Sequence, residues 1–70
     1  RLEHLPDDFG RLRRLKVLFL SQNLFRQFPA VLSECPELTM IGFKSNRIED
    51  IPEESFPRSL RWLILTDNRI

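Results

Sequence analysis

The side chains of this 70-residue chain that could carry chemistry include two pairs of adjacent carboxylates, Asp7-Asp8 and Glu53-Glu54. Paired carboxylates can act as general acid and base. Each of these pairs, however, follows a proline at the start of an expected short helix, where negative charge is favoured by the helix dipole. We therefore interpret both pairs as helix-start residues and expect no acid–base catalysis from them.

The lone histidine and the lone cysteine offer no site either. His4 has no second histidine or cysteine at ligand spacing, so we expect no metal site. Cys35 occupies the same place in the sequence pattern as Leu12, which predicts a small buried apolar residue. A single cysteine cannot form an internal disulfide, and this favours a reducing, cytoplasmic compartment. Only Gly10 and Gly42 are glycines, too few for a phosphate-binding loop or a nucleotide cofactor.

The charge of the chain is nearly balanced, with 11 basic and 10 acidic residues and a net charge of +1. Its one local basic run comprises Arg11, Arg13, Arg14 and Lys16. No aromatic residue is interleaved with this run for base stacking, so we interpret it as a solvated turn and expect no nucleic-acid partner. No apolar run approaches the roughly 20 residues that span a bilayer, so we expect no membrane insertion.

The sequence repeats one motif at a fixed period. Segments 15–25, 38–48 and 60–70 follow the pattern L-x-x-L-x-L-x-x-N-x-L with conservative replacements, and their spacing is 23 and then 22 residues. The pattern includes an asparagine each time: Asn23, Asn46 and Asn68. Self-similarity at such a period is typical of a solenoid, in which each repeat buries its apolar side chains against its neighbours.

Within each motif the apolar residues alternate as they do in a strand. Leu18 and Leu20 lie on one face, and their equivalents are Ile41 with Phe43 and Leu63 with Leu65. The strands must be parallel, because the same phase recurs after each full turn of chain. The asparagine ends each strand and can bond to backbone groups that the bend leaves unpaired. We expect a structural ladder of stacked amides rather than a catalytic role.

The return segments begin at Pro6, Pro29 and Pro52, which suit the first position of a short helix or 3₁₀ turn. The outer segments are then 7–14, 30–37 and 53–59. The third is one residue shorter and contains Pro57, so we expect a 3₁₀ or irregular turn there, with Phe56 buried.

These motifs resemble the leucine-rich repeat proteins over the whole chain. The period and the Leu/Phe/Ile-Pro steps are similar to the intracellular type, which includes Ras-group and scaffold repeats, and to bacterial arrays that precede a protein-kinase-like domain. The resemblance implies an α/β solenoid: a right-handed superhelix of about three repeats, with a parallel sheet on its concave face. It implies one domain over 1–70, with a half-repeat at 1–14 and repeats starting at 15, 38 and 60, and we expect this to be a piece of a longer array.

The residues between the buried positions should point out of the sheet in rows. These rows are Val17, Met40 and Trp62; Phe19, Gly42 and Ile64; Ser21, Lys44 and Thr66; and Gln22, Ser45 and Asp67. The first two rows are almost wholly apolar, and large exposed apolar patches tend to mark contacts. Trp62 is of the residue type most enriched in interface hot spots. Gly42 should leave a notch between Phe19 and Ile64, and Lys44 with Asp67 should form a polar rim.

The sequence therefore predicts a non-enzymatic module that binds a protein on its concave face. The alternative is a regulatory or spacer segment of a multidomain enzyme, such as a protein kinase, that docks on its own catalytic domain. Two plainer readings of the apolar rows also stay open. Strand propensity alone favours Val, Phe, Ile and Trp, and other parts of a parent chain could cover the face.

Overall fold

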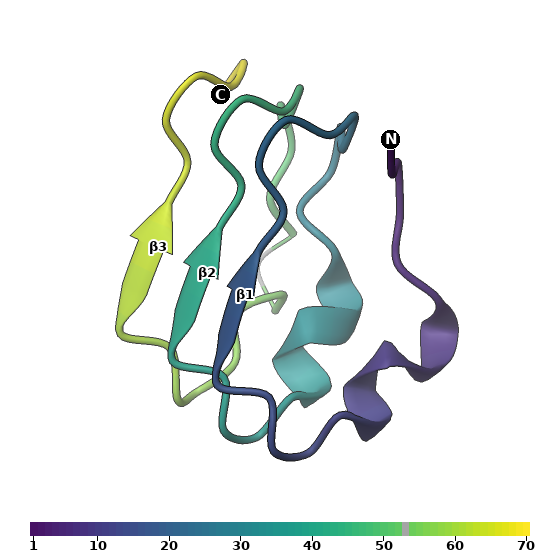
Figure 1. The fold of residues 1–70 in the computed structure, drawn as a ribbon, viewed down its shortest axis with the longest axis vertical. Helices are drawn as coiled ribbons and strands as arrows, with labels where there is room; N and C mark the ends of the chain where they lie inside the picture. Colours follow the sequence, from purple (N-terminus) through teal and green to yellow (C-terminus); the bar gives the residue numbers. More distant parts are fainter. Residues whose placement is uncertain (53) are drawn as a thin grey trace.

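The structure, a computed structural model, describes residues 1–52 and 54–70. Short 3₁₀ helices precede the first two of three very short strands, as Figure 1 shows. In chain order the elements are η1 (Asp7–Arg11), β1 (Val17–Phe19), η2 (Ala30–Glu34), β2 (Met40–Gly42) and β3 (Trp62–Ile64). Both helices directly follow a proline in an extended conformation, Pro6 and Pro29. The expected 3₁₀ turns after these prolines are thereby confirmed.

The three strands form one parallel sheet in the order β1-β2-β3. The register pairs the positions that the sequence pattern makes equivalent: Val17 with Met40 and Trp62, Leu18 with Ile41 and Leu63, and Phe19 with Gly42 and Ile64. This confirms the parallel arrangement and the first two rows expected from the sequence. A single-residue slip would turn every side chain to the other face.

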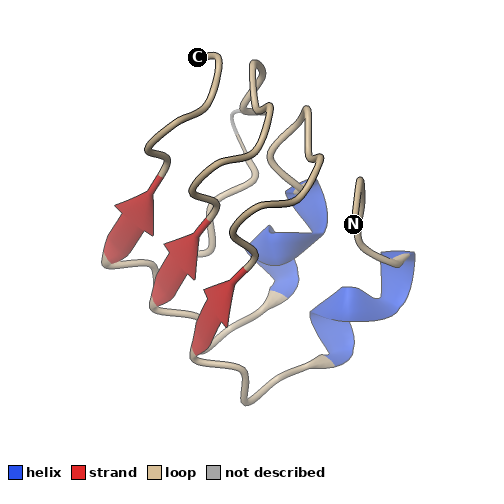
Figure 2. Ribbon diagram, turned by 45° about the horizontal axis from the view of Figure 1, so that its top comes forward, coloured by secondary structure: helices blue, strands red, loops and turns tan. Residues whose placement is uncertain are grey.

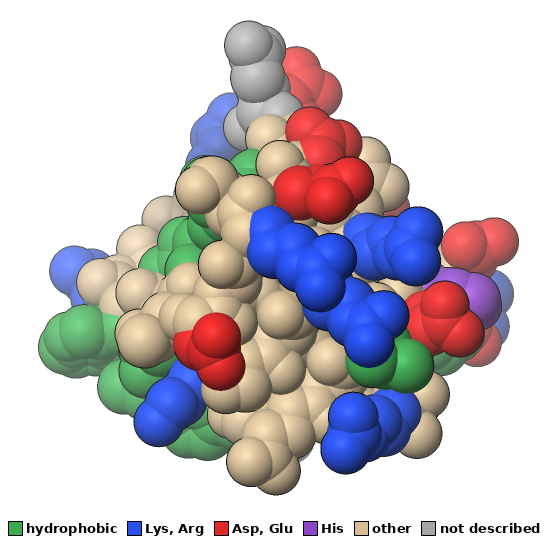
Figure 3. Space-filling view, turned by 90° about the horizontal axis from the view of Figure 1, so that it is seen from above, with side chains coloured by type: hydrophobic (Ala, Val, Ile, Leu, Met, Phe, Trp, Pro, Cys, Tyr) green, Lys and Arg blue, Asp and Glu red, His purple; other side chains and the backbone are tan. Residues whose placement is uncertain are grey.

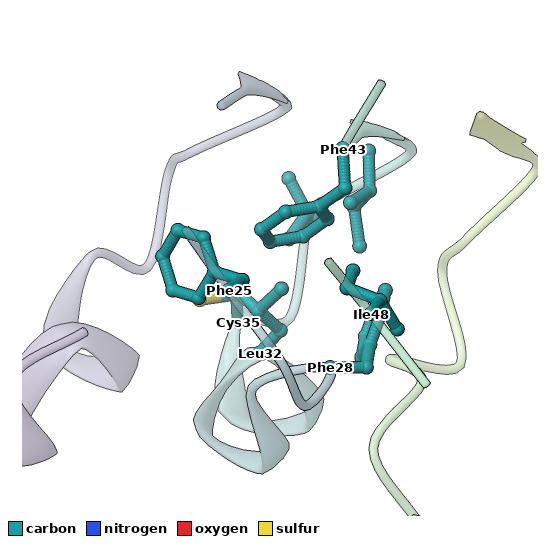
Figure 4. Close-up of a cluster of buried hydrophobic side chains, with 8 residues drawn as sticks. Phe25, Phe28, Leu32, Cys35, Phe43 and Ile48 are labelled. Atoms are coloured by element: carbon teal, nitrogen blue, oxygen red, sulfur yellow. The ribbon is translucent and has the colours of Figure 1, made fainter. Parts of the chain in front are cut away.

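Both helices lie on one side of the sheet (Figure 2). The buried side chains form one hydrophobic cluster that includes residues of η2 and β2, and partly buried residues of β1 and β3 pack against it. Figure 4 shows its centre, where the rings of Phe25 and Phe43 meet edge to face with centroids 5.0 Å apart. Phe28 packs on the same Phe43 ring at 5.4 Å. Leu32 and Cys35 are also fully buried. Each such side chain contributes roughly 1.5–3 kcal/mol when it is withdrawn from water.

Burial is deepest under the central strand. Ile41 and Phe43 are fully buried, whereas the equivalent side chains beside β1 and β3 are only partly buried. Those four side chains are Leu18, Leu20, Leu63 and Leu65. The inward face therefore carries the alternation that the motif predicts, with the central segment covered from both sides.

Asn46 holds the end of the central strand to the preceding segment. Its amide nitrogen donates to the carbonyl oxygen of Leu20 at 2.9 Å and to that of Phe43 at 3.0 Å. Its Oδ1 atom accepts the backbone N–H of Phe25 at 3.2 Å. Asn46 is 8% exposed, so these backbone groups have little access to water. The side chain thus supplies hydrogen bonds that the loop at the end of β2 does not supply itself.

The other two asparagines repeat this geometry. Asn23 donates to Leu20, and Asn68 donates to Phe43, so each of these two carbonyl oxygens accepts from two successive asparagines. Their Oδ1 atoms accept the backbone N–H of Leu2 and of Ile48. The ladder therefore runs through shared backbone carbonyls rather than directly from amide to amide.

The residue before each asparagine adopts a left-handed backbone conformation. Gln22, Ser45 and Asp67 have φ angles of 58°, 60° and 60°. Such a conformation costs a non-glycine residue of order 1–3 kcal/mol and persists only where its surroundings enforce it. The backbone N–H of Gln22 donates to Lys44 at 2.9 Å, and that of Ser45 donates to Thr66 at 3.0 Å. Bonds to the neighbouring segment therefore fix the turn.

The segment after Pro52 departs from the expectation in one respect. Glu53 lies outside the described residues. The predictions for the Glu53-Glu54 pair and for the start of the third outer segment therefore stay predictions. Residues 54–59 form an irregular turn, as expected. The prediction that Phe56 is buried is wrong, because its side chain is 40% exposed. Ser55 takes the buried position instead, and its hydroxyl donates to the carbonyl oxygen of Pro52 at 2.6 Å.

Replacing Asn46 by alanine should lower the free energy of unfolding by about 3 kcal/mol, since each buried backbone group left unpaired costs about 1–3 kcal/mol. Urea titration followed by circular dichroism measures this. Gln27→Ala is the matched control, because the exposed Gln27 amide also bonds across segments, to Asp50 at 3.0 Å. We expect the control to cost less than about 0.5 kcal/mol. Equal losses in the two variants would contradict the role given to Asn46.

Candidate functional site

The face of the sheet turned away from η1 and η2 is open and apolar. We call it the open face and define it by the outward side chains of the strands: Val17, Phe19, Met40, Gly42, Trp62 and Ile64. Four of these are large and substantially exposed, Val17 at 47%, Phe19 at 55%, Trp62 at 57% and Ile64 at 39%. They account for half of the eight exposed large hydrophobic side chains among the described residues. The apolar rows expected from the sequence thus lie on one surface.

The central strand contributes the least exposed surface to the open face. Met40 is half-buried and Gly42 is buried. The exposed side chains stand on the two edge strands, β1 and β3. A partner would meet two apolar ridges, Val17 with Phe19 and Trp62 with Ile64, and the Phe19 ring extends from its ridge over Gly42.

The expected notch at Gly42 is occupied by the chain itself. A Cβ atom built on Gly42 would stand 2.8 Å from Cε1 of Phe19 and closer still to Cδ1. The Phe19 ring therefore leans across β2 and covers the glycine, and no partner side chain can enter there while the ring stays. The prediction of an open notch between Phe19 and Ile64 is therefore wrong, because the Phe19 ring fills this space.

The polar rim lies where the strands end. Ser45 donates from its hydroxyl to the Asp67 carboxylate at 2.8 Å, which links two neighbouring segments. Lys44 is exposed beside them. Three other residues of the two polar rows are also exposed: Ser21, Gln22 and Thr66. Figure 3 looks onto this end of the molecule, where basic and acidic side chains lie next to one another and hydrophobic side chains gather at the left, on the side of β3.

The side chains considered as catalytic or metal-binding candidates lie on other parts of the surface. His4, Asp7 and Asp8 are exposed. The two aspartates line a hollow of about 680 Å³ together with Glu34, Arg11 and other residues of the helical side. Across residues 1–52 and 54–70, no three histidine, cysteine or acidic side chains are grouped so that they could hold a metal ion. In the same part of the chain no helix has the length and hydropathy needed to cross a membrane.

Cys35 is fully buried, as predicted, although Leu12, its equivalent in the sequence pattern, is 47% exposed. Its Sγ atom lies 3.8 Å from the carbonyl oxygen of Phe9. Burial raises the pKa of this thiol above its ordinary value of 9.0, and the negative charge of Glu34 raises it further. The thiol is therefore neutral at physiological pH and serves as a packing group between η1 and η2.

Comparison with protein-family models, with curated proteins and with solved structures finds no match to this chain.

Gly42→Ala should lower the free energy of unfolding by about 1–3 kcal/mol, because the added methyl group meets the Phe19 ring. Phe19→Ala removes that obstacle. In a double-mutant cycle measured by urea unfolding, we expect the paired variant to cost less than the two single variants together, with a coupling energy of about 0.5–3 kcal/mol. Additive effects would show that the ring does not rest on Gly42.

Proposed function

We propose that this chain is a leucine-rich repeat segment, part of a solenoid, that binds another protein through its open face. The observation that carries the proposal is the group of four exposed apolar side chains on β1 and β3, namely Val17, Phe19, Trp62 and Ile64. Exposed apolar patches of this kind tend to be protein contacts in soluble proteins. The in-register parallel pairing of equivalent motif positions supports the repeat assignment.

The sheet is suited to present such a surface without rearrangement. Its strands are held in register by backbone bonds and by the asparagine side chains behind their ends. A surface that is ordered before binding loses little conformational freedom on binding, and this favours affinity. Recognition on this account rests on shape and on apolar burial.

The strength of binding can be bounded from the exposed side chains. Full burial of one large apolar side chain contributes roughly 1.5–3 kcal/mol, and these four start about half buried, so together they supply roughly 3–6 kcal/mol. Loss of translational and rotational freedom costs an estimated 4 kcal/mol or more. The four apolar side chains alone therefore support only weak, reversible binding, and tighter binding requires contacts at their edges.

Trp62→Ala should weaken binding to a purified partner by about tenfold or more, because tryptophan is among the residue types most enriched in interface hot spots. The partner is first identified with a photo-crosslinking amino acid placed at the exposed position 66, which leaves Trp62 in place, and its affinity is then measured by calorimetry. Leu12→Ala is the control, since Leu12 is 47% exposed but lies on the helical side. We expect this control to change the affinity by less than about twofold.

The fold must be checked in the same experiment. Trp62→Ala should leave the free energy of unfolding nearly unchanged, whereas Leu63→Ala should lower it, because Leu63 packs against the core. The proposal is wrong if Trp62→Ala binds the partner as the unaltered chain does. It is also wrong if Leu12→Ala loses as much affinity as Trp62→Ala.

A further inference from the structure

Positive charge is concentrated where the chain enters the three strands. Segments 13–16, 36–39 and 58–61 lead into β1, β2 and β3 and hold five basic residues against one acid, a net charge of +4 in a chain whose total is +1. The charged residues are Arg13, Arg14, Lys16, Arg58 and Arg61, with Glu37. All six are exposed.

The sheet brings the two halves of this charge together. The carbonyl oxygen of Lys16 accepts the backbone N–H of Thr39 at 2.8 Å, and the carbonyl oxygen of Thr39 accepts that of Arg61 at 2.8 Å. Lys16, Thr39 and Arg61 therefore stand side by side at the strand starts, although 45 positions of sequence separate the two basic residues. Two strand spacings place their backbones roughly 10 Å apart, within about one Debye length at physiological salt.

We define the basic end by Lys16 and Arg61, which directly precede strands of the open face, whereas Arg13 and Arg58 line hollows that also contain Glu34 and other acidic side chains. Lys16 precedes Val17 in the chain, and Arg61 precedes Trp62. The other end of the face differs, because there Asp67 lies beside Ser45, and basic and acidic side chains lie next to one another (Figure 3). The apolar ridges thus have a strongly basic end and a mixed end.

We propose that the occupant of the open face is an acidic and apolar protein segment, whose large apolar side chains cover β1 and β3 and whose carboxylates meet the basic end. The proposal rests on the proposed function and names the class of its partner. Charge complementarity fixes the direction in which such a segment lies, and it accelerates association more than it adds affinity.

Two other anionic partners fit the surface less well. A single-stranded nucleic acid would pair with the cations and could stack bases on Phe19 and Trp62, but it would leave the exposed aliphatic side chains of Val17 and Ile64 without an apolar partner. An anionic bilayer attracts clusters of cations that face one plane. The five cations here stand instead at one end of the apolar face. Binding to a nucleic acid and binding to a bilayer are both tested in the experiment below.

The experiment selects binders without assuming a partner. A displayed library of random peptides is panned against the 70-residue chain after depletion on Trp62→Ala, so that only peptides requiring the open face are kept. We expect the selected peptides to combine several large apolar residues with an excess of Asp and Glu. Selected peptides that are neutral or basic would overturn the inference while supporting the proposed function. An absence of peptides that depend on Trp62 would count against both.

Charge reversal then locates the contact. Lys16→Glu/Arg61→Glu should weaken binding of a selected acidic peptide by about tenfold and should reduce the salt dependence of its association rate. Arg47→Glu/Arg69→Glu is the matched control, with the same charge change at two exposed residues that follow the asparagines. We expect this control to change the affinity by less than about threefold. Equal effects would show that net charge, and not the basic end, attracts the peptide.

The same proteins are tested against vesicles of phosphatidylserine and phosphatidylcholine and against single-stranded DNA. We expect binding to neither probe at the protein concentrations that saturate the selected peptides. Binding to vesicles or DNA that is tighter than peptide binding, and that is lost in Lys16→Glu/Arg61→Glu, would overturn the assignment of the basic end to a protein segment.

Discussion

A strand that ends in a bend leaves backbone donors and acceptors without partners, and in this chain the side-chain amides of three asparagines satisfy them. Each amide nitrogen donates to a carbonyl oxygen at the end of its own strand. Each amide oxygen accepts a backbone N–H of the preceding segment. Asn46 does so at the centre, between Leu20, Phe43 and Phe25. Because an unpaired backbone group inside a protein costs free energy, these bonds fix the register in which neighbouring segments stack.

The surface of the molecule follows from that constraint. Once the segments are held in this register, Val17 pairs with Met40, and Met40 pairs with Trp62. The outward side chains then form rows. The rows place two apolar ridges on the edge strands and bring the cations at positions 16 and 61 to the same end of the sheet. No single segment carries either feature, since both exist only when the strands are in register.

The periodic positions could be predicted from the sequence and the individual contacts could not. A pattern with a fixed period determines strand phase, parallel pairing and the burial of Ile41 and Phe43, because those depend only on spacing. The ring of Phe19 over Gly42 depends on a side-chain conformation that no period specifies. Ser55 stands three residues after Pro52, as the buried Leu32 stands three residues after Pro29, so Ser55 takes the inward position and Phe56 is exposed. The left-handed conformation at Gln22, Ser45 and Asp67 was likewise missed, because none of them is a glycine.

The central claim is that the open face is a binding surface, and Trp62 reports on it directly. Trp62 is the single tryptophan of a chain without tyrosine, and it is 57% exposed. Its fluorescence can therefore be followed alone while a partner that itself lacks tryptophan is titrated. The account requires the emission to shift to shorter wavelength as the indole leaves water, in proportion to the fraction bound. A partner that binds the chain and leaves the emission unchanged would contradict it.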